Sequence, residues 1–159
     1  MVAQLHGDEM TSKRETIFAY LATQVAGITA VGGYNTTVKT VERWITAPEL
    51  VDNVPADFPL VVIEEGSEVI EYEPSGMAMT QMVFNIHACL KSSTANVTPT
   101  TLNAFIEDIK IFVEANRKAN GSAVDIVVDS VEIIHAPEIS YAVAIMRCTA
   151  QYYHAVSTP

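Results

Sequence analysis

The feature that most constrains the fold is a run of alternating residues between Met77 and Leu90. Every second side chain in this run falls on one mainly apolar face: Ala78, Thr80, Met82, Phe84, Ile86, Ala88 and Leu90. The polar residues Gln81, Asn85 and His87 fall on the other face. Successive side chains of a strand point to opposite faces of a sheet. The run therefore predicts one long, half-buried strand.

Two other segments have helical periodicity, and the first covers residues 12–26. It begins with the capping-box pattern Ser12-Lys13-Arg14-Glu15, in which the Ser12 hydroxyl can accept the Glu15 amide while the Glu15 carboxylate reaches back. Apolar residues then recur three or four positions apart: Ile17, Phe18, Leu21, Val25 and Ile28. Glycines at positions 27, 32 and 33 end this predicted helix.

The second predicted helix starts at Thr98-Pro99, where a hydroxyl cap precedes a proline whose missing N–H costs nothing. Its apolar stripe consists of Leu102, Phe105, Ile106, Ile109, Phe112 and Val113. The side predicted to face solvent consists of Glu107, Asp108, Lys110 and Glu114. The pair Asn120-Gly121 ends the element, and the apolar stripe has to be buried against a second layer.

Further strands are predicted from β-branched and apolar runs bounded by turn residues. They cover residues 37–44, 60–63, 69–72, 123–135 and 139–153, and a proline-rich loop of unusual length at residues 46–59 follows the first of them. Strands and helices do not alternate along the chain as a parallel doubly wound fold requires. The order predicts an α+β fold in which a mixed or mainly antiparallel sheet carries two helices packed on one face. We expect residues 1–10 to be an N-terminal extension and residues 11–159 a single domain.

Composition limits the possible partners. The 159 residues include nine Lys and Arg against nineteen Asp and Glu, which gives a net charge of −10. Each neutralised phosphate needs a cation, so an acidic chain of this kind is poorly suited to binding nucleic acid. The apolar runs are too short for a bilayer span, and the first ten residues lack the pattern of a secretory signal. We therefore expect no membrane association and a reducing compartment in which both cysteines stay free.

Sequence motifs that carry chemistry are weak. The sequence contains no phosphate loop, GxGxxG, GxSxG or HExxH motif. A Cys89 nucleophile would need His87 or His135 close in space, and Glu64 with Glu65 could form an acid–base pair. For both, the structural interpretation is favoured: a buried cysteine, and a solvated acidic hairpin that contains Glu64, Glu65, Glu68, Glu71 and Glu73. The four histidines share no ligand spacing, and no cofactor or metal is expected.

Arg43 and Trp44 end the first predicted strand, immediately before the proline-rich loop. One interpretation is a core aromatic residue with a neighbour whose charged end reaches solvent. The other is a contact with another subunit, because Trp and Arg are enriched at the hot spots of interfaces. The sequence leaves both open.

Three stretches form a distinctive layout: Gly33-Tyr34-Asn35-Thr36-Thr37-Val38, then Val41-Glu42-Arg43 and, after the loop, Phe58-Pro59-Leu60-Val61-Val62-Ile63. This layout resembles the small tail terminator or tail completion proteins of long-tailed bacteriophages, and the resemblance extends from the first helix to Tyr153. It implies a structural virion protein that is not an enzyme. In that family a homo-oligomeric ring, typically a hexamer, caps the tail tube and provides the joint to the head.

The resemblance also implies partners and a location. The partners would be copies of the chain, the tail tube protein and a neck or head-completion protein, with genomic DNA passing through unbound. The ring would be assembled in the host cytoplasm and lie at the head-proximal end of the tail. We expect the loop at residues 46–59 to meet other chains, with Arg43, Trp44, Asp57 and Phe58 as interface residues. The glutamates of the acidic hairpin are candidates for contacting other chains or lining the channel: Glu64, Glu65, Glu68, Glu71 and Glu73.

Two alternatives stay open. A head–tail connector, or another neck or minor tail protein, could use the same scaffold. A small cytosolic enzyme that uses Glu64/Glu65, or Cys89 with a histidine, is the alternative from a different class.

Overall fold

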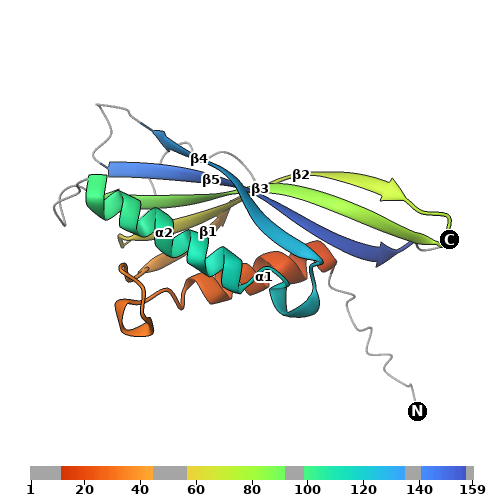
Figure 1. Cartoon of the computed structure of the whole chain (residues 1–159), viewed down its shortest axis with the longest axis horizontal. Helices are drawn as coiled ribbons and strands as arrows, with labels where there is room; N and C mark the ends of the chain where they lie inside the picture. The colour runs from red at the N-terminus through yellow and green to blue at the C-terminus, as the bar shows by residue number, and fades with distance from the viewer. Residues whose placement is uncertain (1–11, 45–56, 92–98, 135–140, 157–159) are drawn as a thin grey trace, which may run out of the picture.

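A five-stranded sheet with two helices on one of its faces forms the protein (Figure 1). The computed structural model describes residues 12–44, 57–91, 99–134 and 141–156. The strand order is β1-β2-β3-β5-β4, with β1 parallel to β2 and the other neighbours antiparallel. The predicted α+β class, with a mixed sheet and two helices, is confirmed. No helix in these ranges is long and apolar enough to cross a bilayer.

The elements follow one another along the chain as α1 (Lys13–Val25), the 3-10 turn η1 (Ala30–Gly32), β1 (Thr40–Trp44), β2 (Leu60–Tyr72), β3 (Met77–Lys91), α2 (Pro99–Ala115), the 3-10 turn η3 (Ala119–Gly121), β4 (Asp125–Ile134) and β5 (Tyr141–Ala155). The long alternating run identified in the sequence is β3, and its burial alternates as predicted from Met77 to Ile86. Beyond Ile86 both faces are buried, so the prediction that His87 lies on an open polar face is wrong. The predicted extension at residues 1–10 and most of the predicted loop at residues 46–59 lie outside the described residues.

The capping box of α1 is half formed. The Ser12 hydroxyl accepts a 3.1 Å hydrogen bond from the Glu15 amide, as predicted. The Glu15 carboxylate accepts two hydrogen bonds from the Arg43 guanidinium of β1, in place of the expected bond to the Ser12 amide. The charge on Arg43 makes it the stronger donor, so this glutamate ties α1 to the sheet.

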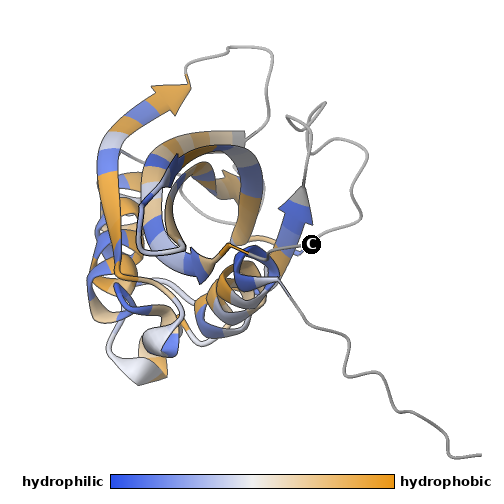
Figure 2. Ribbon diagram, turned by 90° about the vertical axis from the view of Figure 1, so that its right-hand side faces the viewer, coloured by the Kyte–Doolittle hydropathy of each residue, from blue (hydrophilic) through white to orange (hydrophobic). Residues whose placement is uncertain are grey.

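The main core lies between the helices and the sheet. It contains the predicted apolar stripes of both helices and the alternate side chains of β3, together with Met146, Cys148 and Ala150 of β5. The Phe18 and Phe84 rings meet edge to face in this core, with their centroids 5.4 Å apart. A smaller buried cluster lies on the opposite face of the sheet and consists of Leu60, Val62, Cys89 and Val143. Figure 2 shows the strong twist of the strands and the apolar bands along them.

The prediction that residues 60–63 and 69–72 form two separate strands is wrong. They belong to the single strand β2, whose pairing with β3 shifts by a bulge between Glu65 and Glu68. Gly66, which falls between the two predicted strands, lies within this bulge. A Cβ atom at Gly66 would be 2.2 Å from the carbonyl oxygen of Val83, so glycine allows β3 to approach here. The residues of the predicted acidic hairpin, 64–73, therefore belong mainly to one strand of the longer β2–β3 hairpin.

Replacing Gly66 with alanine should destabilise the fold. The new methyl group would meet backbone, which cannot rotate away, so β2 and β3 would have to separate locally. We expect the free energy of unfolding to fall by about 2–3 kcal/mol in urea denaturation. The neighbouring Ser67→Ala variant is the control and should change stability by less than about 0.5 kcal/mol. Equal stability of the two variants would contradict the role given to Gly66.

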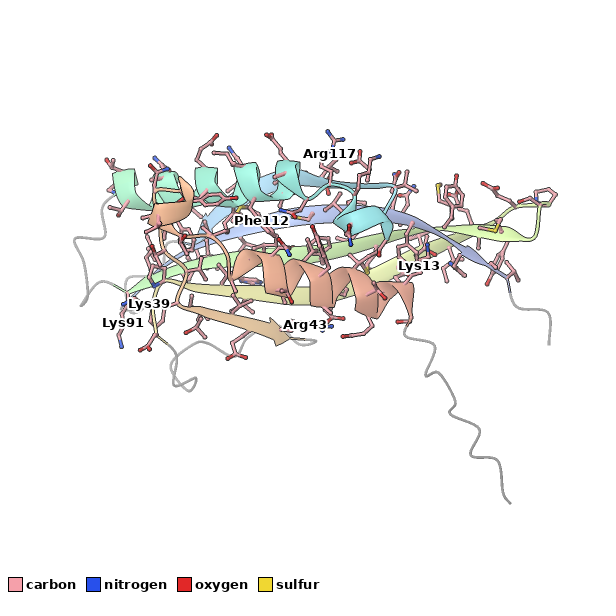
Figure 3. All side chains as sticks on the ribbon, turned by 90° about the horizontal axis from the view of Figure 1, so that it is seen from below. Lys13, Lys39, Arg43, Lys91, Phe112 and Arg117 are labelled. Carbon is pink, nitrogen blue, oxygen red and sulfur yellow. The ribbon has the colours of Figure 1, made fainter. Side chains whose placement is uncertain are left out.

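A three-stranded arm extends the sheet beyond the helices. The arm consists of residues 69–81 of the β2–β3 hairpin and residues 151–155 of β5. Figures 1 and 3 show this end of β2, β3 and β5 projecting past α1. In the described part of the chain, β1 pairs only with residues 60–64 of β2, and β4 pairs with β5 only as far as Gln151. Both outer edges of the arm therefore lie beyond the strands that flank the rest of the sheet.

Candidate subunit interface

Arg43, a predicted interface residue, is held by contacts within its own chain. Its guanidinium donates two 2.8 Å hydrogen bonds to Glu15 and also binds Glu65, with its Nε 3.0 Å from that carboxylate. These bonds raise the pKa of the Arg43 guanidinium and lower the pKa of the Glu15 carboxyl. The guanidinium also lies over the Phe18 ring, 5.7 Å from its centroid.

The other predicted interface residues lie near the start of β2 and the end of β1. Asp57 is exposed, and its amide donates a 3.1 Å hydrogen bond to the Thr40 hydroxyl. Phe58 is partly exposed, and the Lys91 ammonium lies 5.7 Å from its ring centroid. The backbone of Trp44 pairs with that of Glu64, while its side chain lies outside what the structure describes. Contact of these residues with another chain stays a prediction.

The five glutamates of the acidic stretch have three different environments. Glu64 lies on the sheet face opposite the helices and accepts from Asn85, with its carboxylate 2.7 Å from the His87 ring. Glu65 and Glu68 face the helices: both contact Arg14, and the Tyr152 hydroxyl donates to Glu68 at 2.8 Å. Glu71 and Glu73 are exposed on the arm. The expectation that water screens the whole stretch is therefore wrong for Glu65, whose side chain is 10% exposed.

Arg14, Arg43, Glu15, Glu65 and Glu68 together form an ion network that joins α1, β1 and β2 at the base of the arm. The Arg14 guanidinium also donates to the carbonyl of Gly66 at 2.9 Å. Burial raises the pKa of the Tyr152 hydroxyl to about 12, with a further contribution from the charge on Glu68. The network fixes the bulge of β2 to α1, and so fixes the direction in which the arm leaves the domain.

Arg43→Gln should lower the free energy of unfolding by about 2 kcal/mol at neutral pH, because it removes charged hydrogen bonds to the largely buried Glu65. Arg43 lowers the folded-state pKa of Glu15, so the Glu15 contribution is present above the usual carboxyl pKa and is lost as the pH falls through the lowered value. The difference in stability between the two proteins should therefore become smaller in acid, by the part that Glu15 contributes. Urea titrations at several pH values measure this.

Arg117→Gln is the matched control, because Arg117 forms a bidentate pair with Asp125 on the surface. An exposed pair contributes little to stability, so this variant should stay close to wild type. A loss as large as that of Arg43→Gln, or a gap that widens in acid, would contradict the importance of the network.

The enzymatic alternative gains no support from the cysteines. Burial raises the pKa of both the Cys89 and the Cys148 thiol to about 12, whereas a nucleophilic cysteine has to be a thiolate. The ring Nε2 of His87 contacts Glu64. His135 lies outside the described residues. Among the described residues, no group of three or more His, Cys, Asp or Glu side chains is arranged to hold a metal ion.

The most exposed apolar surfaces were not identified from the sequence. One follows β4, which is an edge strand, and contains Val124, Val127, Val131, Ile133 and Ile134. The other is on the arm, where Ile70 and Tyr72 lie on one face of the sheet and Val69 and Tyr153 on the other. The pairs Val127-Val128 and Ile133-Ile134 could have predicted the exposed apolar residues of β4. Adjacent apolar residues place apolar side chains on both faces of a strand.

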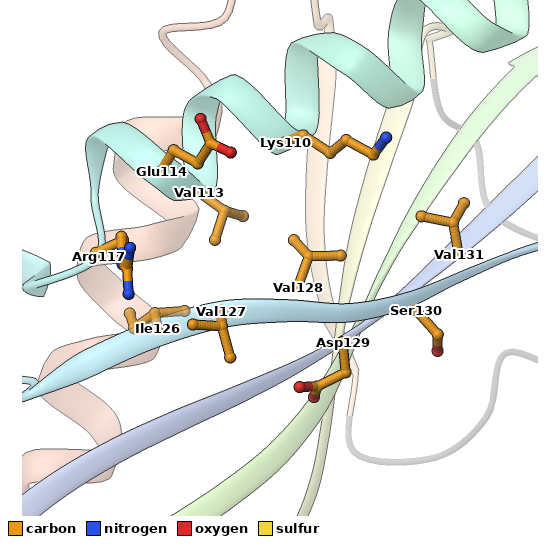
Figure 4. Close-up of a pocket in the computed structure, with 10 residues that line it drawn as sticks. All are labelled: Lys110, Val113, Glu114, Arg117, Ile126, Val127, Val128, Asp129, Ser130 and Val131. Carbon is orange, nitrogen blue, oxygen red and sulfur yellow. The ribbon is translucent and has the colours of Figure 1, made fainter.

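A groove of about 480 Å³ lies between α2 and β4 (Figure 4). Val113 of α2 and Val128 of β4 point toward each other across it, and Val131 lies further along the strand. Lys110 and Glu114 of α2, with Arg117 just after the helix, form one rim of it. The groove thus combines an apolar floor with a charged rim, and it opens beside β4, the last strand of the sheet among the described residues.

No protein-family model matches this sequence, and no curated protein does. A similar solved structure is a chain of the "Virion of native gene transfer agent (GTA) particle", with 10% sequence identity and a TM-score of 0.43. The match covers 86% of this chain and 93% of that chain. A TM-score of this size does not show a shared fold.

Proposed function

We propose that this chain is a structural, self-associating virion protein: a ring-forming tail terminator that caps the phage tail tube and joins it to the head. The observation that carries the proposal is the exposed apolar edge formed by β4. An apolar edge strand tends to pair with other chains, and natural proteins limit this with charges, prolines, bulges or a covering element. β4 has part of this protection, a bulge between Val128 and Ser130 and the exposed charges of Asp129 and Glu132. Here Val127, Val131 and Ile133 are exposed along it.

The arm supports the same function. A soluble monomer rarely leaves apolar groups together on a projecting sheet, whereas assembly surfaces do so. The edge strand and the arm are different surfaces, so contacts between them would be heterologous, and such contacts close into a ring when the rotation between subunits allows it. The resemblance of residues 33–38, 41–43 and 58–63 to tail terminators supplies the identity of the ring.

The net charge of −10 suits a ring through which DNA slides, because a negative channel does not retain the phosphate backbone. The proposed partners are copies of this chain, the tail tube protein and a neck or head-completion protein. Glu71 and Glu73, exposed on the arm, are candidates for the channel surface.

Negative-stain electron microscopy and mass photometry of the purified chain test the proposal. We expect rings with a central opening, and rings seated on one end of tail tubes when the matching tube protein is added. Ile133→Glu, which places a charge on the exposed β4 edge, should reduce ring formation. The proposal would be overturned if the chain remains monomeric at its highest soluble concentration and does not bind the ends of tail tubes. If the chain binds the neck protein and has no affinity for tail tubes, the head–tail connector would be favoured over the tail terminator.

A further inference from the structure

We infer that two copies of this chain pair arm to arm, through the outer edge of β5 at residues 153–155. The second copy adds its own β5 antiparallel to the first, so that the two arms form one continuous sheet. The inference goes beyond the proposed function, because this contact is a two-fold one. It leaves the apolar side chains of β4 and the β2 side of the arm for the contacts of a ring.

Among the described residues, the outer edge of β5 on the arm has no neighbouring strand (Figure 1). β4 pairs with β5 only as far as Gln151, whose carbonyl accepts a 2.7 Å hydrogen bond on that side. The Val156 amide donates on the opposite side, at the β2–β3 turn. Because alternate residues of a strand direct their main-chain groups to opposite sides, Tyr153 and Ala155 face away from β3. Their two N–H and two C=O groups are therefore available to a second strand.

This part of β5 has none of the usual protection of an edge strand. The other open edges of the described sheet carry charges, and two of them also carry bulges: Glu42 and Arg43 on β1, the bulge and Glu71 on β2, and the bulge and Asp129 on β4. Neither residues 74–90 nor residues 148–159 contain Asp, Glu, Lys or Arg, and β5 pairs with β3 without a register shift. A strand edge with neither charge nor bulge is open to strand addition.

The distribution of charge selects a second copy as the source of that strand. The other edges of a copy carry the charges and bulges that oppose strand addition, so its own β5 edge is the one that remains. Self-pairing places identical residues near one another, which an uncharged edge permits. Glu71 and Glu73 lie on the β2 side of each arm. In the joined sheet five strand spacings, about 24 Å, separate them from those of the other copy, beyond the screening length of about 8–10 Å.

One antiparallel register satisfies all four main-chain groups. Tyr153 of each copy pairs with Ala155 of the other, which forms four hydrogen bonds, and His154 lies opposite its own counterpart on the two-fold axis. Val156, which is 39% exposed, then packs beside Tyr152 of the other copy. Strands of this length make a small interface, so we expect a transient dimer with a dissociation constant of about 10 μM or weaker.

His154→Cys tests this register by disulfide formation. In a non-hydrogen-bonded antiparallel pair the two Cβ atoms are about 4.5–5.5 Å apart, close to the spacing that a disulfide needs. Val156→Cys is the matched control on the same strand, because its two introduced cysteines would lie about 13 Å apart in this register. Under mild oxidation of the full chain at about 100 μM, we expect His154→Cys to cross-link at least about tenfold faster than Val156→Cys on non-reducing gels.

The native cysteines do not obscure this result. Cys89 and Cys148 are both buried, and burial raises the pKa of each thiol to about 12. The thiolate is the form that reacts, so these two residues should stay reduced under the same conditions.

Two edge variants, each combined with His154→Cys, test the main-chain contact. Ala155→Pro removes an N–H that points away from β3, so it blocks strand addition without breaking a hydrogen bond of the β3–β5 ladder. Tyr153→Lys places a charge on the edge and leaves the main chain unchanged. Circular dichroism should show that both are folded, and both should lower the rate of cross-linking about tenfold, to that of Val156→Cys.

Equal cross-linking of His154→Cys and Val156→Cys would overturn the inference, as would cross-linking of His154→Cys that persists in both edge variants. The proposed function has a separate readout, because negative-stain images of the same proteins show whether rings form. Normal rings without this cross-link would overturn the arm pairing alone. Cross-linked dimers of a chain that forms no rings and does not bind tube ends would overturn the proposed function alone.

Discussion

Phe84→Ala should lower the free energy of unfolding by about 3–5 kcal/mol, the range for removing a large aromatic side chain from a packed core. Phe84 is buried on β3, and its ring meets that of Phe18 edge to face. The contact joins the centre of the sheet to α1, which cannot move inward to fill the space because the ion network of Arg14 and Arg43 holds it to β1 and β2.

Guanidinium chloride unfolding followed by circular dichroism measures this loss. Gln81→Ala on the opposite face of the same strand is the control, and should change stability by less than about 0.5 kcal/mol. A loss below about 1 kcal/mol for Phe84→Ala would mean that the interface between α1 and the sheet is not tightly packed.

Asp108→Ala is expected to cost about 3 kcal/mol or more. Asp108 is fully buried on α2, and its carboxylate accepts three hydrogen bonds: from the Asn35 amide, the Asn35 side chain and the Thr36 amide, at 2.7–2.9 Å. Alanine would remove the acceptor from these partly covered donors, and a hydrogen bond to a charged group makes a net contribution of about 1.5–3 kcal/mol.

Glu107→Ala is the control for Asp108→Ala, because it removes an exposed carboxylate from the next position of the same helix. It should stay within about 0.5 kcal/mol of wild type, and Asp108→Asn, which keeps one acceptor oxygen, should fall between the two. Equal stability of Asp108→Ala and Glu107→Ala would show that the segment at residues 33–36 does not need this acceptor.

Asp108 also shows where sequence reasoning fails. Its position on α2 placed it with Glu107, Lys110 and Glu114 on the side expected to face solvent, and that prediction is wrong for Asp108 alone. A carboxylate is buried here because two backbone amides from a segment more than seventy residues earlier need an acceptor. Helical periodicity contains no information about such a distant partner. The Asn35-Thr36 pair thus has a structural role in this chain.

The predictions that succeeded rest on local patterns. Alternation identified β3, and the apolar stripes of α1 and α2 identified the helix faces that the core buries. The order of elements then fixed the fold class. The single strand β2 was missed because a glycine commonly marks the end of a strand. Here glycine is needed within the strand, because the backbone of Val83 approaches Gly66 too closely for a side chain. That requirement arises from pairing between strands and is not visible within β2 itself.

The candidate interface was predictable only in part. Arg43 was noticed for its residue type, but its partners Glu15 and Glu65 become neighbours only when β1 lies beside β2 and under α1. The exposed apolar residues of β4 could have been predicted, because the strand contains adjacent apolar pairs. An edge strand with only one buried face does not need apolar side chains on both faces. The projection of the arm depends on the relative lengths of helices and strands, which are the least certain part of any sequence-based assignment.

The strands of the arm are continuous with those of the core, and this has a mechanical consequence. β2, β3 and β5 run from the buried centre of the sheet to the tip, and the hydrogen bonds between them lie across the strand direction. Tension along the arm would load this whole ladder in shear, so that many bonds resist together, whereas a force that peels the tip sideways would open them one at a time. We therefore expect the arm to resist a pull along its length better than a sideways force at its tip.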